Sequence, residues 1–329
     1  MSFWFPPKDQ VTRSQLIDVK TVHDIDQASE LHPGDHLRTQ LSTGGYSGKI
    51  LSGNIGGVTH LIESSSQDIE WETHVAKNVF SFSLVLEQRH EISTYGVRRD
   101  ASTVLVMPPR SAIHTVFAAH GTIGVIAVDP TELLSSKSLL PEAADWLVRL
   151  EKRGEFIQSS WLAERLRDDL RHLTECSVSA NATRIQEVAG TFAVTSIANA
   201  LSLEFLRRRY ENVLKRPPSF ETFWQMRANM LEQLSENDLN LFDLAPNKTG
   251  SKRTIENMFS RNVGLAPMRY FRVLRLNRTR QKLLDRSRLK ESIGDIACEE
   301  GFWDWSRFSA YYLRQFGERP SETRMRAAS

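Results

Sequence analysis

The stretch from Ser292 to Arg324 constrains the fold more than any other, because it places a glycine between two helical patterns. In the first pattern, Ser292 is a suitable N-cap and Asp295 occupies the capping-box position. Gly301 then supplies a turn, since glycine adopts a left-handed backbone conformation without a side-chain clash. A second helix is expected to begin near Asp304 or Ser306. The stretch therefore predicts a helix-turn-helix unit.

The second helix of this unit has an apolar face and a polar face. A rotation of about 100° per residue places some side chains inward and the others outward. Short polar side chains and arginines suit the base edges and phosphates of DNA. A solvated basic face on an ordinary helical hairpin is the alternative explanation. The inward residues are Phe308, Tyr312 and Gln315, and the outward residues are Ser306, Arg307, Ala310 and Arg314.

Several spaced residues of this stretch resemble the second helix-turn-helix unit of AraC/XylS-type transcription regulators. Because many positions agree at once, the resemblance is specific. It implies a first helix-turn-helix unit upstream and a long helix that joins the two. The matching residues are Gly301, Phe302, Ser306, Phe308, Tyr312, Phe316, Gly317, Pro320 and Arg324.

An upstream stretch is similar to the first unit of the same family. Helical patterns predict helices over residues 220–234, 239–245, 251–261 and 267–285, with Ser251 as the N-cap of the third. The resemblance thus covers residues from Phe220 to Arg324 and implies that the two units contact major-groove segments about one turn, or 34 Å, apart. The matching residues are Asp243, Leu244, Ala245, Ser251, Thr254, Ile255, Phe259, Gly264, Ala266, Pro267, Tyr270, Arg275 and Leu276.

The first unit departs from the family pattern at Pro246 to Gly250, where apolar residues usually continue the helix. Proline removes a helical hydrogen bond and clashes with the preceding turn. Lys248 also stands where the family usually has a buried residue. We therefore expect the first unit to be displaced or to contribute mainly phosphate contacts.

The resemblance assigns DNA contacts position by position. In the first unit they fall on Arg253, Glu256 and Asn257, and we expect Lys252 to contact phosphate. Helical periodicity places Ile255, Met258 and Phe259 inward, and it independently selects part of the same outward set. Trp305 is equally compatible with DNA contact and with the border of the core. In the second unit the contacts fall on Trp305, Ser306, Arg307, Ser309 and Ala310, whereas Arg272, Arg275, Arg278 and Arg280 of the long helix are expected to be solvated or paired internally.

Charge and cysteine content agree with a nucleic-acid partner and argue against a disulfide scaffold. Residues 219–329 hold 19 Lys or Arg and 14 Asp or Glu, a net charge of +5, whereas the remainder of the 329-residue chain has a net charge of −3. A basic region favours a polyanionic partner. Only Cys176 and Cys298 occur, which excludes a disulfide framework and a four-cysteine zinc site. The sequence has no signal-peptide pattern and no run of 18 uncharged apolar residues, so we expect a cytoplasmic protein without membrane contact.

The N-terminal region predicts an antiparallel β structure followed by helices, which makes the fold class α+β. Residues 1–40 are expected to be irregular except for a helix or turn over 24–31. Short apolar or alternating runs bounded by turn residues indicate a cupin-like barrel or sandwich. The runs span residues 48–54, 58–63, 79–86, 91–97, 103–107 and 122–128, and helices are expected over 142–153, 160–176 and 183–210.

These patterns divide the chain into two domains. A sensor and dimerisation domain is predicted over residues 1–210, β-rich over 46–129 and helical over 131–210. A linker over 211–218 contains Pro217 and Pro218, and we expect little contact across it. The DNA-binding domain is predicted over 219–329. The last N-terminal helix could pack on its own domain or form a homodimer through a stripe of Ile185, Val188, Phe192, Ile197, Leu201 and Phe205.

The resemblance implies a transcription regulator that is not an enzyme, that needs no cofactor and that binds double-stranded DNA, with RNA polymerase as a further partner if it activates. It also implies a small-molecule effector on the N-terminal domain. The segment Leu31–Gly34, with Tyr46, Ser47 and Gly48, loosely resembles ethanolamine-utilisation-type regulators, but the effector stays unknown. Aromatic residues such as Trp71 and Phe82 are possible effector contacts, although core positions are the simpler explanation.

Two other functions remain open. One is a metal-dependent enzyme of the cupin type, which requires clustered imidazoles and a carboxylate. No His-x-His pair occurs, and His74, His90, His114 and His120 are scattered, so no catalytic or metal-binding residues are assigned. The other is an architectural DNA-binding protein without a sensor, against which the long β-rich region argues.

Overall fold

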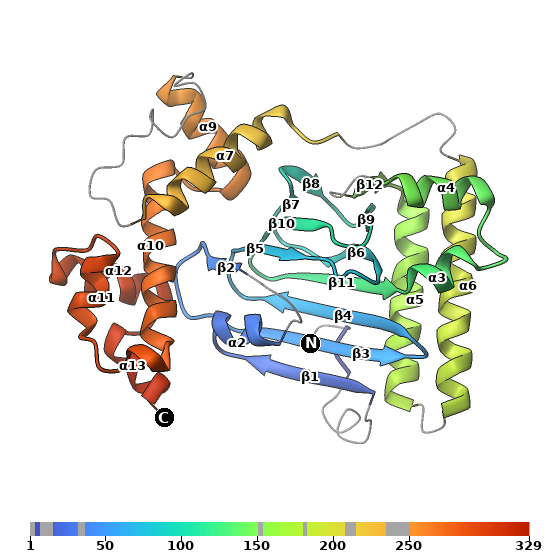
Figure 1. Cartoon of the computed structure of the whole chain (residues 1–329), viewed down its shortest axis with the longest axis horizontal. Coiled ribbons are helices and arrows are strands. Elements are labelled where there is room, and N and C mark those ends of the chain that lie inside the picture. The colour runs from blue at the N-terminus through green and yellow to red at the C-terminus, as the bar shows by residue number, and fades with distance from the viewer. Residues whose placement is uncertain are drawn as a thin grey trace.

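The computed structural model describes residues 4–6, 16–31, 37–150, 154–179, 183–207, 215–234 and 251–328. Within these ranges a β-rich N-terminal region precedes a helical C-terminal region, as the sequence predicts (Figure 1). The strands lie in the middle of the molecule, two long helices cover one side, and the C-terminal helices lie at the opposite side.

The strands of the described ranges form two antiparallel sheets. The larger sheet has the order β1 (Ile17–Val22), β3 (Gly48–Ile55), β4 (Val58–Ser65), β11 (Gly121–Val128), β6 (Phe80–Glu87), β9 (Thr103–Met107) and β12 (Glu155–Gln158). The smaller sheet has the order β2 (Leu37–Gln40), β5 (Ile69–His74), β10 (Ala112–Phe117), β7 (Ile92–Thr94) and β8 (Val97–Arg99).

The two sheets pack against each other through buried side chains. One cluster combines Ile50 and Ile123 of the larger sheet with Ile69, Trp71 and Phe117 of the smaller sheet. Successive strand residues point to opposite faces, so the larger sheet also buries a second face. That face is covered by helices.

Helices α5 (Ser160–Ser179) and α6 (Thr183–Arg207) cover this second face of the larger sheet, together with α3 (Pro130–Leu134) and α4 (Pro141–Arg149) (Figure 1). The tip of the β3–β4 hairpin reaches α6 at Gly190. A Cβ atom there would lie 2.2 Å from the Gly56 carbonyl oxygen. Glycine is therefore required at this close approach.

The C-terminal region is helical. Its long helix α10 contacts helices from both ends of the region. The helices are α7 (Pro218–Glu232), α9 (Lys252–Val263), α10 (Pro267–Leu284), the short 3₁₀ helix η3 (Arg286–Arg288), α11 (Ile293–Glu299), α12 (Trp305–Phe316) and α13 (Pro320–Ala328).

The prediction that residues 1–40 are irregular is wrong for β1 and β2, although the predicted helix is present as α2 (Ile25–Glu30). Strands β5 and β10 were also not predicted. Each of β2, β5 and β10 carries a buried charged or titratable side chain, namely Arg38, Glu70 and His114. Such side chains hide the apolar alternation on which strand prediction depends.

Two predicted elements have different boundaries. The strand expected over residues 91–97 is split into β7 and β8, because Tyr95 and Gly96 both have positive φ and form a turn. The helix expected over 142–153 ends at Arg149, and the strand β12 follows it. Gly154, with φ of 69°, lies directly before that strand.

The predicted stripe on α6 is partly wrong. Ile197 and Leu201 are buried, whereas Ile185, Val188 and Phe192 are exposed. Among the described residues, the segment Arg184–Arg207 alone is long and apolar enough to cross a bilayer, judged by length and composition. Because 56% of its most apolar window is buried within the molecule, this is weak evidence for a membrane helix.

The expectation of little contact between the two regions is wrong. One hydrophobic cluster combines Val97 and Leu105 of the sheets with Phe223, Phe259 and Tyr270 of the C-terminal helices. Residues 211–214 of the predicted linker lie outside the described residues. The two regions therefore share a hydrophobic core.

Candidate nucleic-acid interface

Helices α11 and α12 form a compact pair around a glycine turn. The hydroxyl of Ser292 accepts a hydrogen bond from the Asp295 backbone N–H at 3.0 Å, as predicted for the N-cap of α11. Gly301 has φ of 74°, the left-handed conformation predicted for the turn. Asp304 caps α12, because its carboxylate accepts a hydrogen bond from the Arg307 backbone N–H at 3.0 Å.

The apolar face of α12 is buried as predicted. Phe308, Tyr312 and Gln315 are each at most 3% exposed. Phe308 and Tyr312 pack edge to face, with ring centroids 5.6 Å apart, and join Leu276 and Ile296 in one cluster. This core fixes which side of α12 faces outward.

Acidic residues at the C-terminal end of α11 pair with basic residues behind this unit. Lys282 Nζ lies 2.6 Å from the buried Glu300, and Arg288 contacts Glu299 at 2.7 Å. Hydrogen bonds from Arg288 and Lys282 lower the pKa of Glu299 to about 2. Arg278 also lies 3.3 Å from Glu300. These cations are paired internally, as predicted for Arg278.

Helix α9 presents a similar division between buried and exposed faces. Ile255, Met258 and Phe259 are buried, as predicted. The hydroxyl of Ser251 caps the helix by accepting a hydrogen bond from the Thr254 backbone N–H at 3.2 Å. Gly264 ends it with φ of 69°. The helix expected over 239–245 and the interruption at 246–250 lie outside the described residues.

The residues predicted to contact DNA lie on two outer faces. Eight of the nine are exposed and Ser309 is half-buried. Arg307 lies 3.3 Å from Asp304, but the two side chains are 78% and 54% exposed, so this pair is available to a partner. On α9 the exposed residues are Lys252, Arg253, Glu256 and Asn257, and on α12 they are Trp305, Ser306, Arg307 and Ala310.

The tryptophans at the start of α12 differ in their packing. Trp305 is 52% exposed, and its ring packs 5.6 Å from that of Phe308, so it lies at the border of the core and also faces solvent. Trp303 was not among the predicted DNA contacts, yet it is 68% exposed directly before the N-cap Asp304. Its position beside a predicted N-cap is the sequence feature that could have identified it as a surface residue of this unit.

A further group that sequence reasoning missed joins α12 to the N-terminal region. Gln315 was correctly predicted to point inward. Its partner Gln40, however, lies in a segment that was expected to be irregular, 275 residues away. No local pattern relates two residues at that separation.

Comparisons with known proteins match the C-terminal region. Residues 249–326 match the family described as "Helix-turn-helix domain". The chain is 31% identical over 140 residues to the "XylDLEGF operon transcriptional activator" of Pseudomonas putida, which covers 43% of this chain and 41% of that protein. It is 34% identical over 95 residues to the "HTH-type transcriptional regulator ArgR" of Pseudomonas aeruginosa, over 29% of this chain and 28% of that protein. The match thus spans less than half of either relative.

A solved structure is similar to part of this chain over nearly the whole length of the solved chain. It is a transcriptional regulator from Chromobacterium violaceum, described among AraC-type DNA-binding domain-containing proteins. It is 32% identical, and the match covers 34% of this chain and 96% of that chain, with a TM-score of 0.31 over the comparison. The resemblance seen in the sequence is confirmed by the sequence matches, which identify the C-terminal region as that of an AraC/XylS-type regulator.

Proposed function

We propose that this chain is a transcription regulator that binds double-stranded DNA in a sequence-specific manner. The observation that carries the proposal is the outer face of α12, where Ser306, Arg307 and Ala310 are exposed on a helix whose opposite face is buried. Arginine donates two hydrogen bonds to guanine in the major groove, and short side chains allow the helix to approach the bases. This face lies within the matched helix-turn-helix region.

We further propose that α9 and α12 are the DNA-facing helices of two helix-turn-helix units joined by α10. Arg253 and Asn257 are exposed on α9, and arginine and asparagine are the residue types that pair with guanine and adenine. Two such helices would contact successive major-groove segments about 34 Å apart. Because the sequence departs from the family pattern at Pro246 to Gly250, we expect sequence recognition to depend mainly on α12.

The N-terminal region is proposed to be a cupin-like sensor for a small-molecule effector. Between its sheets, Arg38 and Glu63 form a buried ion pair, with Arg38 Nη2 3.0 Å from Glu63 Oε2. The Arg38 guanidinium lies 4.7 Å from the centre of the Trp71 ring. Ligand sites often combine such aromatic walls with a few fixed polar groups.

We propose that the protein acts as a homodimer in the cytoplasm, with RNA polymerase as an additional partner if it activates transcription. The support for a dimer is the exposed face of α6, where Ile185, Phe192, Asn199 and Leu206 recur every seven residues. A repeat of seven with one polar Asn is the pattern of a helix that pairs with a second helix.

The metal-dependent enzyme is the weaker alternative. Among the described residues, no group of three His, Cys, Asp or Glu side chains is placed to hold a metal ion. His114 is instead packed beside Glu70, with Nε2 2.7 Å from Oε1. We therefore assign no catalytic residue.

The proposal is tested by selecting bound sequences from a pool of randomised DNA duplexes. With the enriched duplex, Arg307→Ala should lower affinity by about 1 to 3 kcal/mol and relax the preference at one base position. Lys252→Ala should instead weaken binding to all sequences and reduce the slope of log affinity against log salt by about 1.

Arg98→Ala is the matched control, because Arg98 is also exposed and paired with a single carboxylate, that of Glu91. It should bind as the wild type does. If Arg307→Ala left both affinity and preferred sequence unchanged, the assignment of α12 would be wrong. If the wild-type protein enriched no sequence, the proposed function itself would fail.

A further inference from the structure

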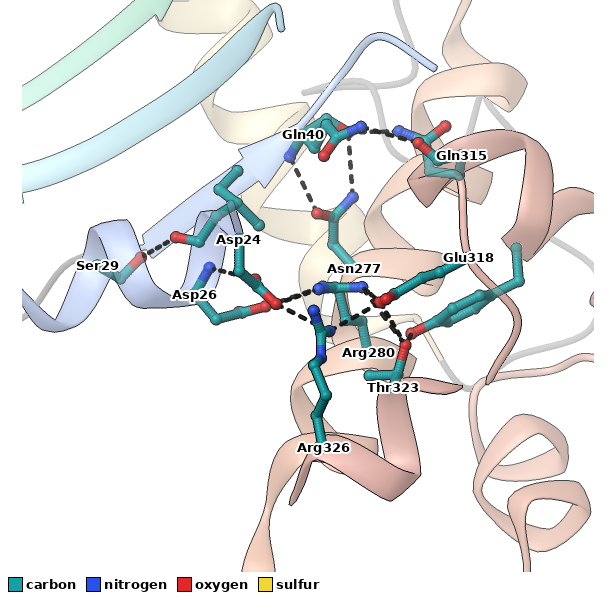
Figure 2. Close-up of polar contacts among 12 residues, drawn as sticks. Asp24, Asp26, Ser29, Gln40, Asn277, Arg280, Gln315, Glu318, Thr323 and Arg326 are labelled. Atoms are coloured by element: carbon teal, nitrogen blue, oxygen red, sulfur yellow. Dashed lines mark hydrogen bonds and ion pairs between the residues drawn. The ribbon is translucent and has the colours of Figure 1, made fainter. Parts of the chain in front are cut away.

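The C-terminal end of α12 is held by the N-terminal region (Figure 2). The backbone carbonyl of Gln315 accepts hydrogen bonds from Gln40 Nε2 at 2.8 Å and from the Gly44 backbone N–H at 3.0 Å. In return, Gln315 Nε2 donates to the carbonyls of Gln40 at 2.7 Å and Ser42 at 3.0 Å. The last carbonyls of a helix have no partner within it. Here Gln40 of β2 and Gly44 of the following loop supply hydrogen-bond donors to one of these carbonyls, that of Gln315.

The backbone permits this close approach. Gly317 ends α12 with φ of 72°, and a Cβ atom at this position would lie 2.9 Å from the Gly45 backbone nitrogen. A side chain on Gly317 would therefore meet the main chain of the loop. The end of the helix and the loop fit together at main-chain level.

The same residue of β2 also holds the long helix α10. The Gln40 backbone N–H donates to Asn277 Oδ1 at 2.9 Å, and Asn277 Nδ2 donates to the Gln40 carbonyl at 3.2 Å. Gln40, Asn277 and Gln315 are each at most 5% exposed. Buried amides are costly to leave unpaired, so this set favours one arrangement of β2, α10 and α12.

A fixed end of α12 also fixes the direction of its outer face. Arg307 lies eight residues before Gln315, which is about 12 Å along a helix at 1.5 Å per residue. A small rotation of α12 at Gln315 would therefore also displace the side chain of Arg307. Base recognition requires side chains to be held within about 0.5 Å of their working geometry.

The N-terminal region does not cover the face that is proposed to contact DNA. Ser306, Arg307 and Ala310 are exposed while the contact with Gln40 is made. The contact can therefore influence recognition through the orientation of α12 and not by blocking it. Arg38, two residues before Gln40 on β2, lies in the buried pair with Glu63. One short strand thus connects the interior of the sheets with α12.

We propose that Gln40 is a positioning residue for base recognition: it holds the C-terminal end of α12 and so makes the N-terminal region part of the sequence-reading unit. This inference rests on the proposed function, since it concerns the regulation of the same DNA-binding face. It extends that function by assigning a role in base discrimination to a residue outside the helix-turn-helix region.

The test uses the full-length protein and the duplex enriched from the randomised pool. Arg307→Ala first identifies the base positions that α12 recognises. Gln40→Ala and Gln40→Glu should then each lose about fivefold or more of the discrimination at those positions. In Gln40→Glu a carboxylate of the same size faces the carbonyls of Ser42, Gly44 and Gln315, all within 3.1 Å of the amide nitrogen it replaces.

Affinity for an unselected duplex and the salt slope should stay at their wild-type values, because the phosphate-contacting residues are untouched. Gln158→Ala is the matched control. The side-chain amide of Gln158 forms hydrogen bonds with the hydroxyls of Thr103 and Ser102 at the far edge of the larger sheet. It should discriminate as the wild type does.

The outcomes separate the two proposals. Failure of the wild-type protein to enrich any sequence would overturn the proposed function. An enriched sequence together with wild-type discrimination by folded Gln40→Ala would overturn only the role of Gln40. A loss spread evenly over all base positions would show a merely structural effect and would also overturn it. If Gln40→Glu does not fold, Gln40→Ala alone decides.

Discussion

The buried carboxylate of Glu70 links the smaller sheet to the C-terminal helices. Glu70 lies 2.7 Å from Arg227 Nε, 2.8 Å from the Tyr270 hydroxyl and 2.7 Å from His114 Nε2. Burial by itself raises the pKa of Glu70, but the charge of Arg227 and the hydrogen bonds of His114 and Tyr270 outweigh it and lower the pKa to about 2. The ionised carboxylate is thus the form that the fold requires.

Glu70→Ala should lower the free energy of unfolding by about 3 kcal/mol, the lower end of the range for a broken buried ion pair. It removes the partner of Arg227 Nε and of the Tyr270 hydroxyl, and it leaves Glu72, 28% exposed and 3.1 Å from Arg227 Nη1, as the remaining carboxylate beside that guanidinium. Urea denaturation at pH 7 measures the change. Glu91→Ala removes an exposed carboxylate, 63% accessible and paired with Arg98, and should cost less than about 1 kcal/mol. A loss in Glu70→Ala as small as that of Glu91→Ala would contradict the assigned role.

At the scale of elements, α2 is attached to α10 and to the C-terminal helices by charged side chains (Figure 2). Arg280 contacts Asp24, Asp26 and Glu318, and Arg326 lies 2.8 Å from both Asp24 and Glu318. Three carboxylates thus surround two guanidinium groups. Burial and the neighbouring charge of Asp24 raise the pKa of Asp26 to about 7.

Asp26→Asn should remove a pH dependence of stability. A raised pKa means that the folded wild-type protein binds the proton more tightly than the unfolded chain does. The wild type therefore gains stability from Asp26 as the pH falls from about 8 to about 5, and loses it as the pH rises through 7. The variant has no proton to bind, so its melting temperature relative to the wild type should fall by about 2 to 4 °C over the same range.

Thermal unfolding at pH 8 and pH 5 measures this difference. The other groups that face Asp26 are present in both proteins, namely Asp24, Glu318, Arg280 and Arg326, together with the adjacent His23 and Tyr312. Burial by itself raises the pKa of Asp24, but other interactions, above all the charge of Arg280, outweigh it and lower the pKa, so this carboxylate stays ionised from pH 8 to pH 5. A difference that stays constant, or that grows in favour of the variant on acidification, would contradict the raised pKa of Asp26.

Sequence patterns predict the elements whose burial is apolar and local. The strand β9 alternates between two buried faces, and α9, α11 and α12 follow caps and a helical period, so the outer faces of the proposed site were predictable. The strands β2 and β5 were not predictable, because Arg38 and Glu70 resemble surface residues until their partners are known. Those partners, Glu63 and Arg227, are distant in sequence and become neighbours only in the folded chain.

At the scale of the whole molecule, the two regions form one structure with a shared core. Phe220 lies beside Gly96 and packs with its ring 5.9 Å from that of Tyr95. Two consecutive prolines predict a break in a helix, but they carry no information on what the following helix packs against. A hydrophobic face of α6, by contrast, is left exposed by the described residues: Ile185, Val188 and Phe192 are all exposed.

The exposed face of α6 supports the last prediction, which concerns assembly. Val188 is 63% exposed at the same face as Ile185 and Phe192. In a paired helix it would be buried, so Val188→Asp would place an unpaired charge in an apolar contact. The dissociation constant of the homodimer should rise by about tenfold or more.

Analytical ultracentrifugation over a range of protein concentrations measures this constant directly. Val148→Asp is the matched control, because Val148 on α4 is 67% exposed and lies outside the seven-residue repeat of α6. It should dimerise as the wild type does. A dimer that survives Val188→Asp unchanged, or a wild-type protein that is monomeric at all concentrations, would show that α6 is not the interface. If Val188→Asp weakens the dimer and Val148→Asp does not, α6 is the interface, and the two DNA-binding regions are joined through it.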